Sequence, residues 1–114
     1  MATFSKLKLS GSTNGRGIKV AQTGTAGTAI HTAHATALDE VWLYAYNGHT
    51  ADVVLTIEWG GVGVPEDNIV VTVPFKAGLM LVVPGLIVTG GVAVAAFAGT
   101  TNVIVITGYV NRIA

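Results

Sequence analysis

Two histidines and two pairs of acids are the side chains in this sequence whose types and spacing could do chemistry. His31 and His34 lie three residues apart, and Asp39-Glu40 and Glu66-Asp67 are adjacent acids. On a helix the two imidazoles would share a face and could bind one metal ion, but on a strand they point to opposite faces. The flanking sequence favours a strand or a loop, and it places no third ligand beside them. We therefore expect no metal site.

The acid pairs could serve glycoside hydrolysis only if two carboxyl groups faced each other across a glycosidic bond. Adjacent residues on a strand point apart, so we interpret both pairs as charges at strand entrances and loop ends, where a sheet meets solvent. The sequence has no cysteine, and its serines, Ser5, Ser10 and Ser12, lie in no G-x-S-x-G motif and have no histidine near them in the sequence. The sequence predicts no enzyme and no cofactor.

Strand patterns fill the chain, and no segment follows the 3.6-residue period of a helix. They predict an all-β, single-domain β-sandwich or jelly-roll-like fold with about eight to ten short antiparallel strands. The predicted strands are 4–9, 17–21, 28–33, 38–46, 52–59, 68–73, 79–83, 86–89, 92–98 and 102–110. Pro84-Gly85 predicts a type II turn at a corner between sheets, and Gly90-Gly91 predicts a two-residue hairpin.

Residues 37–61 hold both tryptophans, two of the three tyrosines and four of the six acids. We interpret this stretch as a central hairpin that turns at Asn47-Gly48. Its first strand has apolar residues on both faces. In its second strand the odd-numbered residues from 53 to 59 face the core, while Thr56 and Glu58 look outward.

The composition favours association with a partner. At 114 residues the chain has room for one core, which makes residues 1–114 a single domain. It is 51% hydrophobic and only 11% charged, so we expect apolar surface to remain for a homo-oligomer or a larger assembly. Residues 1–17 are either an N-terminal arm or the first strand. Within them GSTNGRG lacks the spacing of a phosphate-binding loop, and we interpret it as a mobile turn that presents Arg16.

Nucleic acid and membrane are not expected partners. The only basic clustering is Lys6, Lys8, Arg16 and Lys19, and the sequence shows no basic stripe interleaved with aromatic residues. The stretch LMLVVPGLIVTGGVAVAAFA has the length of a membrane-spanning helix. Its Pro-Gly and Gly-Gly pairs and its β-branched residues favour short buried strands instead.

Four segments together resemble small virion structural proteins of tailed bacteriophages. They are LDEVWLYAYN, VVLTIEWGG, VPFKAGLMLVVPGLIVTGGVAVAAF and VIVITGYVNRI, and the resemblance covers roughly residues 37–113. It implies a capsid decoration (cement) protein, a β-sandwich or jelly-roll unit that is often trimeric and binds the outer shell. The expected partner is the major capsid protein, and the expected location is the capsid surface of a virion assembled in the host cytoplasm.

The N-terminal segment is the expected capsid contact, because it holds the only basic cluster in the part of the chain that looks least like a core. Phe4 would enter an apolar pocket, and Lys6, Lys8 and Arg16 would pair with acidic groups of the shell. Two alternatives stay open. A carbohydrate-binding or receptor-binding module would expose its aromatic residues, Trp42, Tyr44, Tyr46 or Trp59, and a head–tail or tail protein would form rings.

Overall fold

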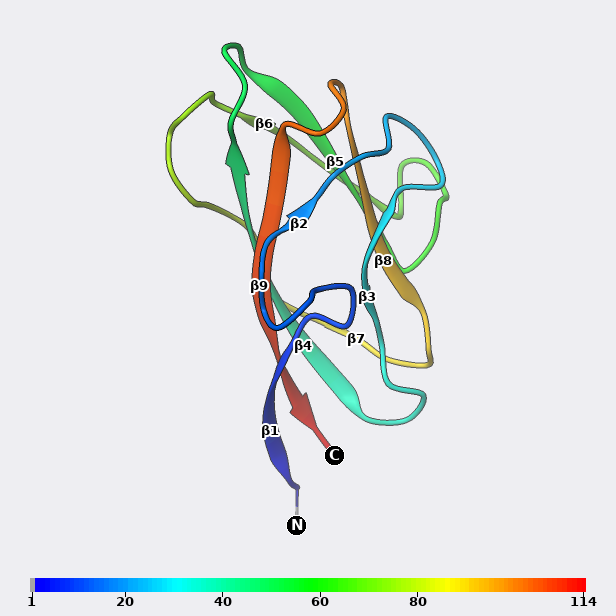
Figure 1. The fold of residues 1–114 in the computed structure, drawn as a ribbon. Coiled ribbons are helices and arrows are strands. Elements are labelled where there is room, and N and C mark those ends of the chain that lie inside the picture. Colours follow the sequence, from blue (N-terminus) through cyan, green and yellow to red (C-terminus); the bar gives the residue numbers. More distant parts are fainter. Residues whose placement is uncertain (1) are drawn as a thin grey trace.

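The computed structural model describes residues 2–114, which form nine strands and no helix (Figure 1). The strands are β1 (Phe4–Lys8), β2 (Ile18–Lys19), β3 (Thr28–Thr32), β4 (Leu38–Asn47), β5 (Val53–Trp59), β6 (Asn68–Val73), β7 (Met80–Val88), β8 (Ala93–Ala98) and β9 (Ile104–Ile113). The prediction of an all-β, single-domain sandwich is confirmed, and the number of strands falls in the predicted range.

Two antiparallel sheets pack face to face. Sheet A has the order β1-β9-β4-β7, and the short β2 also pairs with β9; sheet B has the order β3-β8-β5-β6. Pairs of strands are nested along the chain, because β9 pairs with β1 and β2, β8 with β3, β7 with β4, and β6 with β5. The chain is therefore folded like one long hairpin that has been wrapped around a core.

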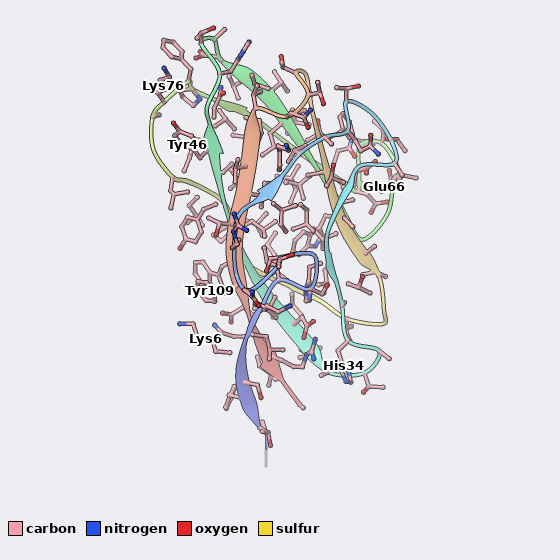
Figure 2. The ribbon with its side chains drawn as sticks, in the orientation of Figure 1. Lys6, His34, Tyr46, Glu66, Lys76 and Tyr109 are labelled. Atoms are coloured by element: carbon pink, nitrogen blue, oxygen red, sulfur yellow. The ribbon has the colours of Figure 1, made fainter. Side chains whose placement is uncertain are left out.

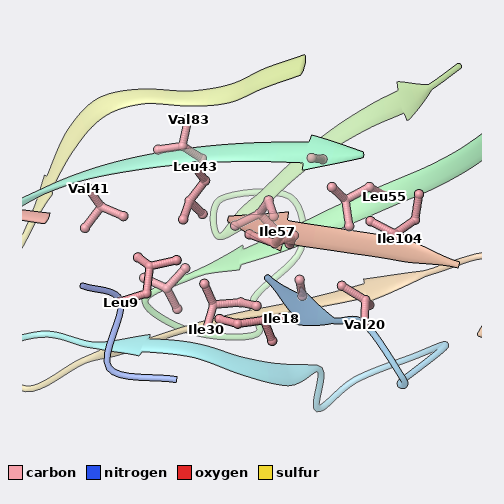
Figure 3. Close-up of a cluster of buried hydrophobic side chains, with 14 of the residues drawn as sticks. Leu9, Ile18, Val20, Ile30, Val41, Leu43, Leu55, Ile57, Val83 and Ile104 are labelled. Carbon is pink, nitrogen blue, oxygen red and sulfur yellow. The ribbon is translucent and has the colours of Figure 1, made fainter. Parts of the chain in front are cut away.

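The core lies between the sheets and follows from the two-residue period of the strands. Every second residue of β4, namely Val41, Leu43 and Ala45, is fully buried, and Leu55 and Ile57 of β5 meet them from sheet B. Figure 3 shows Val41, Leu43, Leu55 and Ile57 in the space between the two sheets. Burial of aliphatic side chains of this size stabilises a fold by about 1.5–3 kcal/mol each.

The predicted central hairpin is wrong, although both of its strands exist. β4 lies in sheet A and β5 in sheet B, so the turn at Asn47-Gly48 carries the chain across the sandwich. Asn47 holds this crossing in place, because its buried Nδ2 donates to the carbonyl oxygens of Ala51 and Val73, and its Oδ1 accepts from the N–H of His49. The hairpin predicted at Gly90-Gly91 is wrong for the same reason, since β7 and β8 lie in different sheets.

The predicted turn at Pro84-Gly85 is a β-bulge within one strand. Val41 pairs with Leu86 and Trp42 pairs with Pro84, which leaves Gly85 without a partner on β4. Gly85 has a φ of 74°, a backbone conformation that glycine adopts without steric cost. The predicted strands 79–83 and 86–89 are consequently the two halves of β7.

Thr56 and Glu58 are buried although they point away from the core. The segment between β2 and β3 covers this part of sheet B, since Oγ1 of Thr25 and the N–H of Gly27 both donate to the carboxylate of Glu58. These side chains therefore point outward, as expected, but the covering segment keeps them out of solvent.

Residues 4–8 form a strand of sheet A and not a detached arm. β1 pairs with β9 along its whole length, and Thr3 and Ala114 exchange two backbone hydrogen bonds beyond it. Leu9, directly after β1, is part of the core. Over residues 4–8 the chain is therefore the first strand and not a free N-terminal arm.

Gly85→Ala is expected to lower the free energy of unfolding by more than Gly91→Ala. Both glycines have a φ of 74°, which costs any other residue about 1–2 kcal/mol. Only at Gly85 does the new methyl group meet a ring, at 2.8 Å from Cζ2 of Trp42, and overpacking of this kind costs about 1–3 kcal/mol more. Urea unfolding measures both losses. Equal losses would show that the Trp42 ring moves aside without cost.

Candidate interaction surface

Residues 2–114 enclose no pocket and contain no group of three or more His, Cys, Asp or Glu side chains that could hold a metal ion. In the same residues no helix is long and apolar enough to cross a membrane. The polar side chains of interest lie in one buried cluster and along one edge of sheet A.

Asp39, near the start of β4, is the centre of the buried cluster. Its Oδ1 accepts a hydrogen bond from Nε of Arg112 at 2.7 Å, and its Oδ2 accepts one from Nη2 of the same residue at 3.0 Å. Oδ2 also lies 2.8 Å from Nε2 of His31 and accepts the N–H of His34. Because Arg112 belongs to β9 in sheet A and His31 to β3 in sheet B, Asp39, Arg112 and His31 form a clasp between the sheets.

His31 occupies both of its ring nitrogens inside the fold. Nδ1 accepts the backbone N–H of Ser10 at 3.1 Å, so the proton of the neutral ring lies on Nε2 and is donated to Asp39. Oγ of Ser10 in turn accepts the N–H of Thr32. A serine, a histidine and an aspartate are therefore brought together, but the histidine nitrogen that a hydroxyl would need is bonded to the backbone, and His31 is only 3% exposed.

The carboxylate of Asp39 stays ionised in this cluster. Burial raises its pKa, but the hydrogen bonds from Arg112, His31 and the N–H of His34, together with the charge of Arg112, outweigh burial and lower the pKa to about 2. The hydrogen bond to Asp39 likewise raises the pKa of Arg112. Hydrogen bonds from Nε1 of Trp42 and Nδ2 of Asn111 lower the pKa of the neighbouring Glu40.

The interpretation of the acid pairs as charges at the solvent boundary is wrong for Asp39, which has no exposed surface. It describes the second pair better, because Glu66 is exposed and Asp67 is half-buried, with Oδ2 accepting the N–H of Gly63. The imidazole rings of the two histidines have different partners, since Nε2 of His31 lies against Asp39 whereas Nδ1 of His34 accepts the N–H groups of Thr36 and Ala37 in the following turn.

The four basic residues of the N-terminal segment line one edge of sheet A. β1 and β2 pair with successive parts of β9 on the same side, so Lys6, Lys8 and Lys19 lie along one edge, and the loop between the two strands adds Arg16. All four side chains are exposed. The sequence contains no acid before Asp39, so this edge, which we call the basic edge, has charge of one sign.

The outer face of sheet A carries aromatic rings next to the basic edge. Lys6 lies over the ring of Tyr109, 4.6 Å from its centroid, and Trp42 stacks on Tyr109 with 6.1 Å between centroids. β1 and β4 flank β9, so Lys6 and Trp42 approach Tyr109 from opposite sides. The far side of the Trp42 ring packs on Gly85. Figure 2 shows Lys6, Tyr109 and Tyr46 on one side of the molecule.

Phe4 is the one apolar side chain among the residues predicted to contact a capsid. It is 73% exposed at the end of the basic edge, where it pairs with Ile113, which in turn pairs with Leu38 on the other side. Phe4, Lys6, Lys8 and Arg16 therefore lie on one continuous edge, with the apolar residue at one end. Of the aromatic residues proposed for glycan binding, Trp42, Tyr44 and Tyr46 lie half-buried on this outer face, whereas Trp59 packs against the core.

Sequence reasoning missed the clasp, although one signal for it was present. Asp39 has the same parity on β4 as the core residues Val41, Leu43 and Ala45, so the alternation of a strand places its side chain on the same face as theirs. Its partner Arg112 is 73 residues away, and no local pattern joins the two.

Scans of this chain against protein-family models, curated proteins and solved structures found no match in any of the three comparisons.

Asp39→Asn is expected to be about 2 kcal/mol less stable than the wild type at neutral pH, because Arg112 and His31 lose a charged partner. The pKa of Asp39 is about 2 in the folded protein and 3.8 in the reference state, so its stabilisation is complete above pH 4 and is lost as the pH falls towards 2. Chemical unfolding of both proteins between pH 7 and pH 2 should show that the difference between their free energies of unfolding shrinks as the pH falls. Glu66→Gln, at an exposed acid, is the control. A difference in free energy of unfolding that is as large at pH 2 as at pH 7 would contradict the conclusion that ionised Asp39 stabilises the fold.

Proposed function

We propose that this protein is a non-enzymatic structural protein of a tailed-bacteriophage virion, a decoration or cement protein that binds the outer surface of the capsid shell and stabilises it. We also infer that the sandwich is a jelly roll, because the strand pairs are nested from the outermost to the innermost. This architecture occurs in viral capsid and lectin domains, among others. Because one fold can serve many functions, the proposal rests on the surface and not on the fold.

The basic edge is the observation that carries the proposal. A shell-binding protein needs a contact surface on a framework that does not deform, and Lys6, Lys8 and Arg16 extend from or beside a strand that pairs along its whole length with β9. Phe4 adds a large apolar side chain at one end of the edge. An exposed aromatic anchor next to a row of like charges fits a pocket that is rimmed by acids.

Such a protein would act by linkage, without chemistry. A molecule that binds the assembled shell but not the free subunits stabilises the shell by RT ln(1 + [L]/Kd) per site, which is about 2.7 kcal/mol at a concentration one hundred times Kd. The partner would be the major capsid protein and the location the virion surface. A homo-oligomer belongs to the proposal, and the trimer expected from the resemblance would repeat the contact around a symmetry axis.

Nucleic acid is the competing partner for a basic edge. The sequence shows no basic stripe, but the fold brings four basic side chains together along one edge and places Tyr109 beside them. Two features favour a protein surface. The Lys6 ammonium rests on the Tyr109 ring, and Phe4 offers an apolar anchor for which a phosphate backbone has no counterpart.

Glycan binding is the second candidate function. Trp42, Tyr44 and Tyr46 alternate along β4 and all reach the outer face of sheet A, so three rings follow one another about 7 Å apart. Trp42 is the least suited to stack on a sugar, because its ring lies between Tyr109 and Gly85. Tyr44 and Tyr46 are the residues that would carry this function.

A glycan-binding function predicts that Tyr44→Ala and Tyr46→Ala abolish retention on immobilised polysaccharide. The capsid proposal predicts no retention. Affinity electrophoresis in gels containing cell-wall polysaccharide, with Phe97→Ala on β8 of sheet B as an aromatic control, separates the two functions.

The capsid proposal predicts that the double variant Lys8→Glu/Arg16→Glu binds assembled shells of its virus at least about tenfold more weakly than the wild type, because two attractive charges become repulsive. Co-sedimentation with purified shells measures the affinity. Lys76→Glu, an exposed lysine in the β6–β7 connection, is the matched control and should bind like the wild type.

Substitution is a better test than deletion of residues 2–16, because Leu9 belongs to the core and β1 covers one side of β9. Wild-type binding should weaken when the salt concentration rises from 0.1 M to 1 M, since exposed charges are screened. Binding of the double variant equal to that of the wild type would overturn the proposal. Tighter binding to duplex DNA than to shells, lost in the same variant, would assign the edge to nucleic acid.

A further inference from the structure

The sandwich has two sides at which its sheets end, and the edge strands on these two sides differ in charge and in covering loops. On one side of the sandwich, β1 carries Lys6 and Lys8, and the backbone of β3 is bonded to the loop after β1, with Ile30 accepting the N–H of Gly11 and Thr32 donating to Oγ of Ser10. Charges and covering loops of this kind keep a strand edge from pairing with another chain. On the other side, β6 ends sheet B and β7 ends sheet A.

The β6 and β7 side is apolar and exposed. In residues 2–114, eleven large hydrophobic side chains are exposed, and six of these belong to β6, β7 and the connection between them. They are Val70, Phe75, Leu79, Leu81, Leu86 and Ile87, with exposed fractions between 41% and 65%. We call this set the apolar edge.

The scarcity of charged residues indicates what kind of surface can cover the apolar edge. From Asn68 to Val88 the sequence contains one charged residue, Lys76, and β7 itself contains none. A different protein recognised here would find no charge to orient it or to exclude competitors. A second copy of the same edge is equally apolar and brings no charge against β7 from its own β7, which contains no charged residue.

We propose that the apolar edge is the surface through which copies of this chain associate, with Leu79, Leu81 and Ile87 at the centre of the contact. Antiparallel strands related by a two-fold axis are self-complementary, so β7 can face the same strand of a second copy and bury these side chains from both. The contact is made by side chains more than by a continuous backbone ladder, because Pro84 has no N–H and the bulge at Gly85 interrupts the strand.

This surface is separate from the one proposed for the shell. β9 and β4 lie between β1 and β7, which puts the apolar edge about 14 Å from the basic edge across sheet A. Association at one edge therefore leaves the other open. Self-association through the apolar edge can therefore be tested independently of capsid binding.

The test is the solution mass of the purified chain by light scattering after size exclusion, over a range of micromolar concentrations. The wild type should have twice the 11.6 kDa mass of one chain, because a two-fold contact joins two copies. The double variant Leu81→Glu/Ile87→Glu should be a monomer, because it places charges in the contact. Leu79→Glu, which lies just before β7 and outside its ladder, should shift the equilibrium in the same direction even if the double variant folds poorly.

Phe4→Glu is the matched control, since it adds the same charge at an even more exposed apolar residue on the opposite edge. It should keep the mass of the wild type, and circular dichroism should show that all variants are folded. A wild type that stays monomeric at the highest concentration would overturn the proposal. So would an oligomer whose mass is unchanged in Leu79→Glu and in the double variant, because its interface would then lie elsewhere.

Discussion

The carboxylate of Asp39 is the constraint that joins the two halves of the sandwich at one end. It has no exposed surface, yet its pKa is about 2, so it is a buried negative charge that must keep its partners. Those partners come from β9, from β3 and from the turn that leads into β4. Since a buried charge without partners costs several kcal/mol, the position of each of these elements is fixed by the same group. Through His31 the constraint extends to Ser10, and hence to the loop that follows β1.

This constraint bears on the surface proposed for function. The basic edge consists of β1, β2 and the loop between them, and strands at a sheet edge are ordinarily the first to fray. Here β1 is held by β9 on one side, and Ser10, two residues after its end, is hydrogen-bonded to His31 of the clasp. The transverse row of Lys6, Tyr109 and Trp42 adds side-chain contacts across three strands. The exposed cations are therefore presented from a rigid framework.

Strand positions could be read from the sequence, but strand partners could not. The alternation of β5 is local, and it gave the positions of the core residues Leu55 and Ile57, whereas β4 is apolar on both faces and its core face was left open. The glycines at residues 90–91 show that the chain reverses, but a reversal within a sheet and a crossing between sheets use the same residues. Pro84-Gly85 looks like a turn because a bulge needs the same positive φ. The pairing of Asp39 with Arg112 depends on strand order, which no nearby residue encodes. The basic residues were identified from composition, and only the fold shows that they share an edge.

The separation of charge in this molecule has a consequence that its net charge conceals. Six basic and six acidic residues cancel, yet four of the basic ones lie on a single edge, while the exposed acids Asp52 and Glu66 lie in loops elsewhere. Figure 2 shows Lys6 and Glu66 on opposite sides of the view. A neutral molecule with this arrangement has a permanent electric dipole moment, and the field of an acidic surface exerts a torque on it. Such a molecule would be turned to face that surface before touching it, so a larger share of its collisions would be productive even though it is not drawn in by its net charge.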